Sequence, residues 1–396
     1  MKLAPQHRIY ACFFFFALIT GALMSRLPDI QTHLGVTEGQ LGLTMIGMSI
    51  GSLISLTLGA PVIERLGART TAFLTVLGPA LLLALVPWLD SAVAVFALLL
   101  VTGLLSGALE INLNVQIDRL ETQYGKRYMN TAHGFWSVGF FVTALAGASI
   151  RQSGLSAGLH LGLMALVICI IGGSIIAGIR SAPVPPTAHG EGQHRIAFPH
   201  WGLLPLCLIG FAAFLVEGAG IDWSAIYMRD VFDVEPFVGG MGLTLFAFFM
   251  AAMRLSADPV VSRFGARSVA VVLLGLASLG VTLVWLAPAA WVALAGFALM
   301  GIGCSAVYPL AVSAAAQRTD RPSAVNVAAL GQVSFVVFFL APPMLGFVAE
   351  HLGIRNSYLV CLPLLLAGLW AATFALPTLP SRAPLGSTPE PLPPHG

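Results

Sequence analysis

The chain has 396 residues, of which 57% are hydrophobic and only 9% are charged, and its formal net charge is +2. A soluble domain carries roughly 25% charged residues because it needs a hydrated surface, so this composition excludes an ordinary soluble protein and predicts that most of the chain lies in lipid. The small net charge gives no support to nucleic-acid binding. The five cysteines stand singly in apolar runs, without metal-ligand spacing, and are expected to pack in the core.

Twelve apolar segments are long enough to cross a bilayer, because a helix needs about 20 residues to span the hydrocarbon core. The first has no small-residue cleavage site, so it is interpreted as a span and not as a signal peptide. The sequence therefore predicts an all-α membrane protein with twelve transmembrane helices. In chain order the segments are 9–27, 41–63, 70–89, 92–117, 129–150, 157–179, 202–228, 237–256, 268–287, 289–316, 324–349 and 356–377.

A polar stretch rich in proline and glycine separates the sixth segment from the seventh and is interpreted as a linker between two halves. We expect an N-terminal six-helix half at 1–180, the linker at 181–200 and a C-terminal six-helix half at 201–378. The proline-rich tail at 379–396 is expected to be disordered.

Basic residues are distributed unequally between the two sides of this topology. With the N-terminus inside, fifteen of the 19 lysines and arginines, Arg254 among them, are assigned to the cytoplasmic side. Because cytoplasmic loops collect Lys and Arg, both termini are expected in the cytoplasm. The four basic residues assigned to the other side are Arg26, Arg151, Arg229 and Arg355.

The two halves repeat each other in sequence. The stretch APVIERLGARTTAFLTVLG (60–78) and the stretch DPVVSRFGARSVAVVLLG (258–275) keep Pro, Arg, Gly and Arg at a constant offset of 198 residues. Asn130 and Asn326 recur at an offset of 196. Two parallel six-helix repeats are typical of a transporter whose substrate site lies between the halves near mid-membrane.

The two repeated loops resemble the signature that joins helices 2 and 3, and helices 8 and 9, in the major facilitator superfamily of transporters. Ala60 stands where that signature has its leading glycine. The resemblance implies a conformational role, in which charged groups of the loops latch neighbouring helix ends in the outward-facing state without touching substrate. The matching residues are Glu64, Arg65, Gly67 and Arg69 in the first loop and Asp258, Arg263, Gly265 and Arg267 in the second.

Within this superfamily the chain most resembles the fucose-permease-type branch. GALEINLN (107–114) matches that branch's fourth helix, G-x-L-E-x-x-x-N, and Tyr308-Pro309 and PPMLGFVAE (342–350) match its tenth and eleventh helices. EGAGIDWSAIYMRD (217–230) resembles the seventh helix of an uncharacterised bacterial subgroup. The branch carries an Asp deep in its first helix, whereas GALMSRLPD (21–29) has no acid before Asp29. The branch's two-carboxylate scheme therefore does not carry over to this helix.

Three carboxyl groups fall inside predicted spans, where a charged side chain costs roughly 2.5–3.5 kcal/mol even on the lower scales. Glu110 lies eight residues before Asp118 and so about 12 Å from that end. An apolar setting favours the neutral form of a carboxyl group, so Glu110 is suited to carry a coupling proton, although a permanently hydrogen-bonded neutral acid is the alternative. Glu217 is expected to couple protons or to form a second polar wall, unless it serves helix packing. Asp222, beside Trp223, is expected nearer the outside as a cap or gate.

Asn114 lies four residues after Glu110 and therefore on the same helix face. A carboxyl group and a carboxamide together offer donors and acceptors that suit hydroxyl groups, so this pair is the main candidate for substrate binding. Asn112 and Gln116 form a second pair on a different face. Gln116 is the weaker substrate candidate, and Asn112 is expected to make an interhelical hydrogen bond.

On the next segment, Asn130, His133 and Trp136 recur at i, i+3 and i+6. An indole beside a carboxylate suits a sugar ring, so Trp136 is a substrate candidate, and packing between helices is its alternative role. A histidine suits a proton relay or a donor to the substrate, and the alternative for His133 is a solvated side chain. Arg26 ends the first apolar run and is expected either to attract an anionic substrate, such as a sugar acid, or to extend to the lipid headgroups. The weaker candidates from the second half are Tyr308 and Gln332.

These observations predict a monomeric secondary transporter in a bacterial inner membrane that moves a small polar solute by alternating access. A sugar or sugar derivative and proton symport are favoured, and Na⁺ stays open as the coupling ion. The alternative is a proton-antiport exporter of amphipathic compounds, which the run FAFFMAAM (246–253) favours. A membrane sensor is disfavoured because no loop exceeds about 20 residues. The sequence has no phosphate-binding loop, metal-ligand cluster or nucleophile–base pair, so neither an enzyme nor a cofactor is expected.

Overall fold

The structure, a computed structural model, describes residues 3–126, 128–180 and 199–378. The predicted tail and all of the predicted linker except residues 199–200 lie outside the described residues, as do the side chains of Asn130 and Ala324. Secondary structure in the described ranges is helical throughout, and twelve helical segments there are long and apolar enough to cross a membrane. The predicted twelve-helix membrane architecture is thus confirmed.

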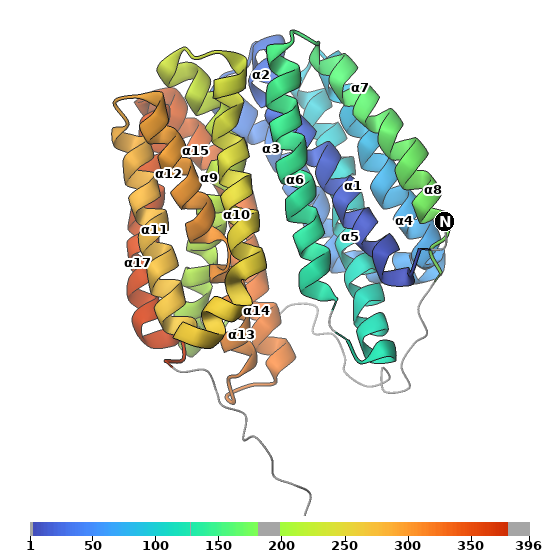
Figure 1. The fold of residues 1–396 in the computed structure, drawn as a ribbon, viewed down its shortest axis with the longest axis vertical. Coiled ribbons are helices and arrows are strands. Elements are labelled where there is room, and N and C mark those ends of the chain that lie inside the picture. The colour runs from blue at the N-terminus through green and yellow to red at the C-terminus, as the bar shows by residue number, and fades with distance from the viewer. Residues whose placement is uncertain (1–2, 127, 181–198, 379–396) are drawn as a thin grey trace, which may run out of the picture.

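The N-terminal helices form one bundle, on the right of Figure 1. They are α1 (Pro5–Ser25), α2 (Leu27–Leu34), α3 (Glu38–Leu58), α4 (Ala60–Leu85), η1 (Val86–Trp88), α5 (Ala92–Tyr124), α6 (Met129–Gln152), α7 (Ala157–Val167), η2 (Ile168–Gly172) and α8 (Gly173–Ile176). We call this bundle the N half. Helix α2 is short and lies at the top of Figure 1, beside the second bundle.

The remaining helices form the second bundle, which we call the C half (Figure 1). They are η3 (Trp201–Leu203), α9 (Leu204–Phe232), α10 (Pro236–Phe264), α11 (Ala266–Leu286), α12 (Ala290–Cys304), α13 (Val307–Ala316), α14 (Ser323–Phe335), α15 (Val337–Leu352), α16 (Ile354–Leu359) and α17 (Cys361–Ala375). Three of the predicted segments are therefore interrupted helices, namely 289–316, 324–349 and 356–377.

The sequence repeat is also a repeat of backbone conformation. Gly67 has φ 76° and ψ 160°, and Gly265, which is 198 residues later, has φ 81° and ψ 151°. A residue with a Cβ rarely adopts a positive φ of this kind, so glycine is required at both positions. Each loop turns the chain sharply between two membrane helices in the same way.

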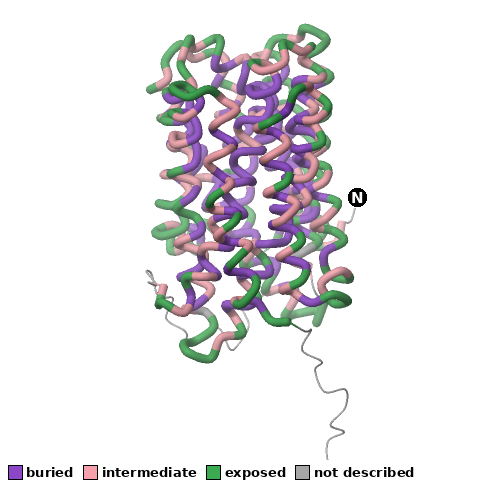
Figure 2. Tube along the Cα trace, turned by 90° about the vertical axis from the view of Figure 1, so that its left-hand side faces the viewer, coloured by how far each residue is buried: buried purple, intermediate pink, exposed green. Residues whose placement is uncertain are grey.

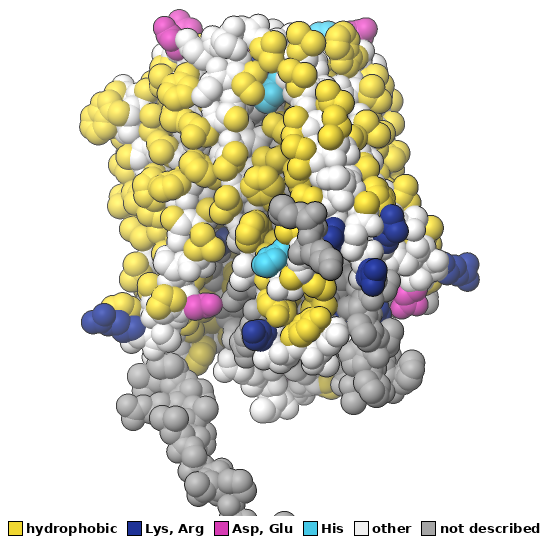
Figure 3. All heavy atoms as spheres, turned by 45° about the vertical axis from the view of Figure 1, so that its right-hand side comes forward, with side chains coloured by type: hydrophobic (Ala, Val, Ile, Leu, Met, Phe, Trp, Pro, Cys, Tyr) yellow, Lys and Arg dark blue, Asp and Glu magenta, His cyan; other side chains and the backbone are white. Residues whose placement is uncertain are grey.

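The outer surface of the bundle is suited to lipid. Hydrophobic side chains cover most of the face in Figure 3, whereas Lys, Arg, Asp and Glu gather toward its two ends. Figure 2 shows that buried residues run along the middle of the bundle and that exposed ones lie at its periphery and ends. Large apolar side chains such as Trp291 and Trp370 are exposed at 73% and 67%. Such exposure is stable in a bilayer, so the protein is a multi-pass membrane protein.

Glycines allow α3 and α5 to approach closely. A Cβ on Gly51 would collide with the Leu100 carbonyl, and a Cβ on Gly103 would collide with the Met48 carbonyl. Small residues permit this kind of packing between membrane helices, where no hydrophobic force drives association. The contact fixes the position of α5, the helix that carries Glu110.

The two halves contact each other near one end of the bundle and also along α6 and α10, where a Cβ on Gly134 would lie 2.9 Å from the Leu255 side chain. We call the end at which α1 stops and α17 begins the far end, and the opposite end the terminal end. Near the far end, Gly240 of α10 lies against Ala148 of α6, and Gly42 of α3 lies against Pro342 of α15. Toward the terminal end α5 packs on α3 and α4, whereas α13 packs on α9 and α14. In Figure 1 the two halves accordingly diverge toward the lower, terminal end.

Candidate functional site

The predicted pair on α5 is present in the structure. The Asn114 side-chain amide donates to Glu110 Oε2 at 3.1 Å, and both side chains are partly buried. The other polar atom of Asn114, Oδ1, is buried and has no hydrogen-bond partner among the described residues. Buried polar atoms nearly always have a partner, so this acceptor is a candidate contact for a hydroxyl or amine donor.

The second pair on α5 serves the helix packing. Asn112 is 2% exposed, and its side-chain amide donates to the Ala68 carbonyl of α4 at 3.1 Å. The predicted interhelical hydrogen bond of Asn112 is therefore confirmed. Gln116 is 5% exposed and also has an interaction partner. These two side chains tie α5 into the N half, which leaves Glu110 and Asn114 as the chemically open pair.

Helix α6 carries the predicted aromatic and histidine candidates and packs mainly on α1 and α10, so it lies between the halves. The His133 side chain is exposed, and its ring centroid lies 4.9 Å from that of Phe13. Trp136 stacks on Phe140, with centroids 5.2 Å apart, and packs against hydrophobic residues of both halves. Asn130 begins the same helix, but its side chain lies outside the described part of the chain.

Glu217 forms an ion pair inside the C half. Arg254 Nη2 donates to both carboxylate oxygens, at 3.1 and 3.0 Å, and Arg254 Nε donates to the Ser305 carbonyl at 3.1 Å. Ser305 lies at the interruption between α12 and α13. Glu217 is 8% exposed, so the pair holds α9 and α10 to the broken span.

The position of Arg254 corrects an expectation from the sequence. It lies in α10, ten residues before Phe264 and so about 15 Å from that helix end, and not in a cytoplasmic segment. With Arg254 removed from the fifteen basic residues assigned to the cytoplasmic side, fourteen remain against four. Local sequence patterns could not predict its partner, because Glu217 is 37 residues away in the sequence.

Asp222 of α9 differs from the other two intramembrane carboxyl groups. It is partly buried, and within the described residues it has neither a hydrogen bond nor an ion pair. Trp223 next to it is 1% exposed and packs on Gly346 of α15. The Trp223 indole N–H also has no hydrogen-bond partner in the described part of the chain.

The weaker candidates of the C half have structural neighbours. The Tyr308 ring lies 4.3 Å from the Phe214 ring, centroid to centroid, and is partly buried. Gln332 of α14 is also partly buried and has an interaction partner. Both come from the half opposite the Glu110–Asn114 pair, so they stay separate candidates.

Arg26 is enclosed in the N half, with 2% of its surface exposed, and therefore does not extend to lipid headgroups. Its Nη1 donates to Asp29 at 2.9 Å, its Nε to His160 Nδ1 at 3.0 Å and its Nη2 to the Leu155 carbonyl at 2.9 Å. Arg151 Nε donates to the other oxygen of Asp29 at 2.7 Å. The sequence reasoning missed this network, although GALMSRLPD places Arg26 and Asp29 three residues apart.

The repeated loops differ in their contacts. Arg267 Nε donates to the Leu376 carbonyl at 2.8 Å, so the second loop is tied to the end of α17. Arg69 at the equivalent position is exposed and lies over the Phe73 ring, 5.9 Å from its centroid. The other charged signature residues, Glu64, Arg65, Asp258 and Arg263, are exposed, and Asp258 has an interaction partner.

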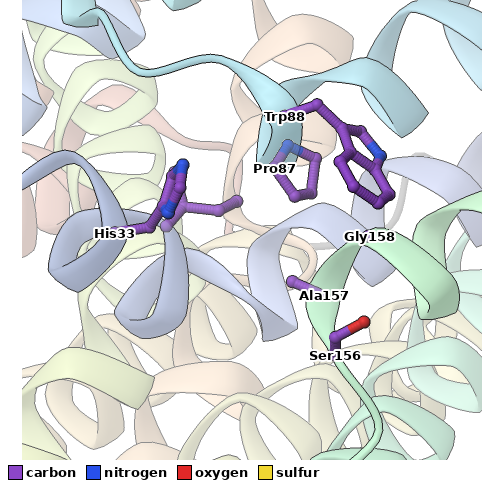
Figure 4. A pocket seen from close by; sticks show the side chains of 7 residues that line it. His33, Pro87, Trp88, Ser156, Ala157 and Gly158 are labelled. Atoms are coloured by element: carbon purple, nitrogen blue, oxygen red, sulfur yellow. The ribbon is translucent and has the colours of Figure 1, made fainter.

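A pocket of about 260 Å³ lies outside the region between the halves (Figure 4). In this view Trp88 lies beside Gly158, and Pro87 and His33 face the same space. A Cβ on Gly158 would lie 2.7 Å from the Trp88 ring, which explains the glycine. All residues that line it belong to the N half near the far end: Ile30, His33, Pro87, Trp88, Ser156, Ala157 and Gly158.

Comparison with known proteins matches this fold and arrangement. The Major Facilitator Superfamily model matches residues 206–394. The uncharacterised transporter y4wD of Sinorhizobium fredii is 29% identical over 383 residues, which cover 94% of this chain and 97% of that protein. The structure of a D-xylose–proton symporter superposes on this chain with a TM-score of 0.72 at 14% identity, and the match covers 95% of this chain and 97% of the symporter. The structure of the Escherichia coli fucose:proton symporter FucP superposes with a TM-score of 0.62 at 17% identity, and the match covers 94% of this chain and 99% of FucP.

The fold and the sequence relatives are those of membrane transporters and not of enzymes. The chain is similar to transporters of the major facilitator superfamily. The two solved structures show the fold alone at these identities, and the curated relative is itself uncharacterised. The solute and the coupling ion therefore have to be argued from this chain's own residues.

Proposed function

We propose that this protein is a proton-coupled symporter that imports a small polar solute, a sugar or sugar derivative, across a bacterial inner membrane as a monomer. The observation that carries the proposal is the Glu110–Asn114 pair, a carboxyl group with one amide donor beside a buried, unpartnered amide oxygen. The carboxyl group binds the coupling proton, and the carboxamide binds a solute hydroxyl. The bias of Lys and Arg supports a terminal end that faces the cytoplasm.

Glu110 is a better proton carrier than Glu217 in this arrangement. Glu217 already has a counter-ion in Arg254, whose Nη2 donates to both carboxylate oxygens, whereas Glu110 has only the Asn114 amide. A group that must gain and lose a proton during each cycle works best without a fixed cation. We therefore assign the coupling proton to Glu110, and to Glu217 the role of holding α9, α10 and the broken span together.

The solute class rests on hydrogen-bonding groups and an aromatic face at the boundary of the two halves. Trp136 contacts both halves, and an indole face packs well against the C–H face of a sugar ring. The D-xylose–proton and fucose:proton symporters, whose fold this chain shares, support the same class. The run that favours an exporter contributes to packing, because Phe246 and Met250 are both fully buried.

The test begins with a thermal-shift screen of the purified protein against sugars, sugar acids and amines, because a ligand of the folded state raises its apparent stability. The ligand found is then used in proteoliposomes with Glu110→Gln. We expect the variant to lose uptake driven by a pH gradient and to keep counterflow exchange. Asp118→Asn, which changes an exposed carboxyl group on the same helix, is the matched control. Uptake by Glu110→Gln at the wild-type rate would overturn the assignment.

A further inference from the structure

The three carboxyl groups inside the membrane spans are not neutralised to the same extent. Glu217 is paired with Arg254, and Glu110 accepts one hydrogen bond from Asn114. Asp222 has neither a cation nor a donor among the described residues. A carboxylate with neither is costly in an apolar setting, and a bound proton removes that cost. This inference rests on the proposed proton coupling, in which Glu110 alone was assigned a proton.

The titratable groups that face this part of α9 are already engaged, whereas the Trp223 indole N–H and the Ser224 hydroxyl, on α9 itself, have no hydrogen-bond partner among the described residues. The Tyr358 hydroxyl of α16 donates to the Ala219 carbonyl at 3.1 Å, so it is not a donor to Asp222. The charged side chains on α9 and on the helices packed against it also have partners. Arg254 holds Glu217, Arg229 pairs with Asp230, Asp29 pairs with Arg26 and Arg151, Glu350 bonds Thr37, and Arg355 donates to the Ala287 carbonyl.

Asp222 lies just inside the contact that closes the far end. Arg229 is seven residues later, on nearly the same face of α9 and about 10.5 Å closer to the far end. Arg229 crosses to the N half, where Nη1 donates to the Pro28 carbonyl at 2.9 Å and Nη2 to Gln31 Oε1 at 2.8 Å. When this contact opens, Asp222 is the first intramembrane carboxyl group of α9 that water from the far side reaches.

We propose that Asp222 is a second proton-carrying residue of this transporter, which holds a proton while the far end is closed and exchanges it with the far side when the Arg229 contact opens. Glu110 is then the proton-carrying residue of the N half, and Asp222 is that of the C half. Asp222 thereby supplies the second acid that the first helix lacks, since Asp29 lies in α2 and is engaged by Arg26 and Arg151.

The proposal is tested on the protein itself, without knowledge of the solute. A carbodiimide such as dicyclohexylcarbodiimide adds to a protonated carboxyl group; the carboxyl proton moves to a carbodiimide nitrogen, and rearrangement gives an N-acylurea with no leaving group. We expect wild-type protein in detergent to carry this adduct on Asp222, to a smaller extent as the pH rises. Glu217, five residues earlier in the same stretch and paired with Arg254, is expected to stay unlabelled. No adduct on Asp222 at any pH at which the protein stays folded would overturn the proposal.

Infrared spectroscopy provides a second measurement on isosteric variants. Asp222→Asn is expected to remove a protonated-carboxyl C=O band from the spectrum, Asp222→Glu to keep it, and Glu217→Gln to leave it unchanged. A band of wild-type intensity in Asp222→Asn would also overturn the proposal. The outcome is separate from the Glu110→Gln transport assay. If Glu110→Gln keeps wild-type uptake while Asp222 is protonated, Glu110 has no coupling role. If Asp222 is not protonated, the assignment of the coupling proton to Glu110 is unaffected.

Discussion

Glu350 of the C half caps a helix of the N half through Thr37. Its Oε2 accepts a hydrogen bond from the Thr37 hydroxyl at 3.0 Å and from the Gly39 backbone N–H at 3.2 Å. Thr37 is the N-cap of α3, where backbone N–H groups lack helical partners and the helix dipole is positive. A carboxylate of one half therefore stabilises a helix start of the other, and only while the far end is closed.

Replacement of Glu350 by Gln is expected to shift the conformational equilibrium toward an open far end. Hydrogen bonds to a charged group contribute about 1.5–3 kcal/mol, and solvent exposure reduces this to about 1 kcal/mol, or roughly a fivefold change in the ratio of the two states. Spin labels at the exposed Val93 and Trp291 positions, near the far end of either half, measure the change as a longer inter-label distance. Asp118→Asn, at an exposed carboxyl group, is the control, and identical distance distributions in the wild type and Glu350→Gln would contradict the expectation.

The Arg254–Glu217 pair predicts a non-additive pattern of stability. Glu217→Gln leaves Arg254 without its counter-ion, and Arg254→Gln leaves Glu217 without one. Loss of one partner of a buried pair costs about 3–5 kcal/mol, and partial exposure of Arg254 lowers this to on the order of 2 kcal/mol for each variant. The double variant Glu217→Gln/Arg254→Gln is expected to lose less than the sum of the two. Thermal unfolding in detergent measures all three variants, and strict additivity would rule out the coupling.

The two halves allow a matched comparison of the repeated loops. Arg267→Ala removes the hydrogen bonds to the Leu376 and Phe374 carbonyls, at 2.8 and 3.4 Å, at the end of α17. Amide hydrogen exchange of residues 374–376 is expected to become about fivefold faster, because a charge-assisted hydrogen bond no longer restrains this end. Arg69→Ala, at the equivalent and exposed position, should leave exchange at the end of α8 near the wild-type rate. Equal effects in the two halves would contradict the asymmetry.

Patterns that repeat along the chain were readable from the sequence. Apolar runs of about 20 residues predict spans because the bilayer sets their length, and the offset of 198 residues predicts the paired loops with Gly67 and Gly265. The geometry of one helix also sufficed for the Glu110–Asn114 pair, because residues four apart share a face.

Contacts between distant helices were not readable in this way. Arg254 and Glu217 are 37 residues apart, and Glu350 and Thr37 are 313 apart. Their pairing depends on how whole helices pack, which no local period encodes. The same holds for Asp222, since its lack of partners follows from what its neighbours bind. Sequence reasoning ranked Glu217 above Asp222 as a proton carrier, and our proposal, which rests on the packing of α10, reverses that order.

The connection between α13 and α14 predicts a dependence of stability on pH. Arg318 donates to both oxygens of Asp320, at 3.0 and 2.9 Å, and Asn326 donates to Oδ1 at 3.1 Å. The hydrogen bonds from the Arg318 guanidinium, with that from Asn326 and the charge of Arg318, hold the pKa of Asp320 well below its usual range. Asn326 is the residue that recurs 196 positions after Asn130, so this repeat position closes a loop in the C half.

Because the folded-state pKa of Asp320 is lowered, its contribution to stability is fully present above the unfolded-state pKa of about 3.9 and is lost as the pH falls through the folded-state pKa. Asp320→Asn keeps the shape of the side chain and removes its charge. The variant should therefore unfold at a lower temperature than the wild type at neutral pH, and the difference should narrow as the pH falls below about 4. Ser323→Ala, at the start of α14, is a control in the same connection. A difference in unfolding temperature that stays constant down to the lowest pH would show that the ionised Asp320 does not stabilise the folded protein.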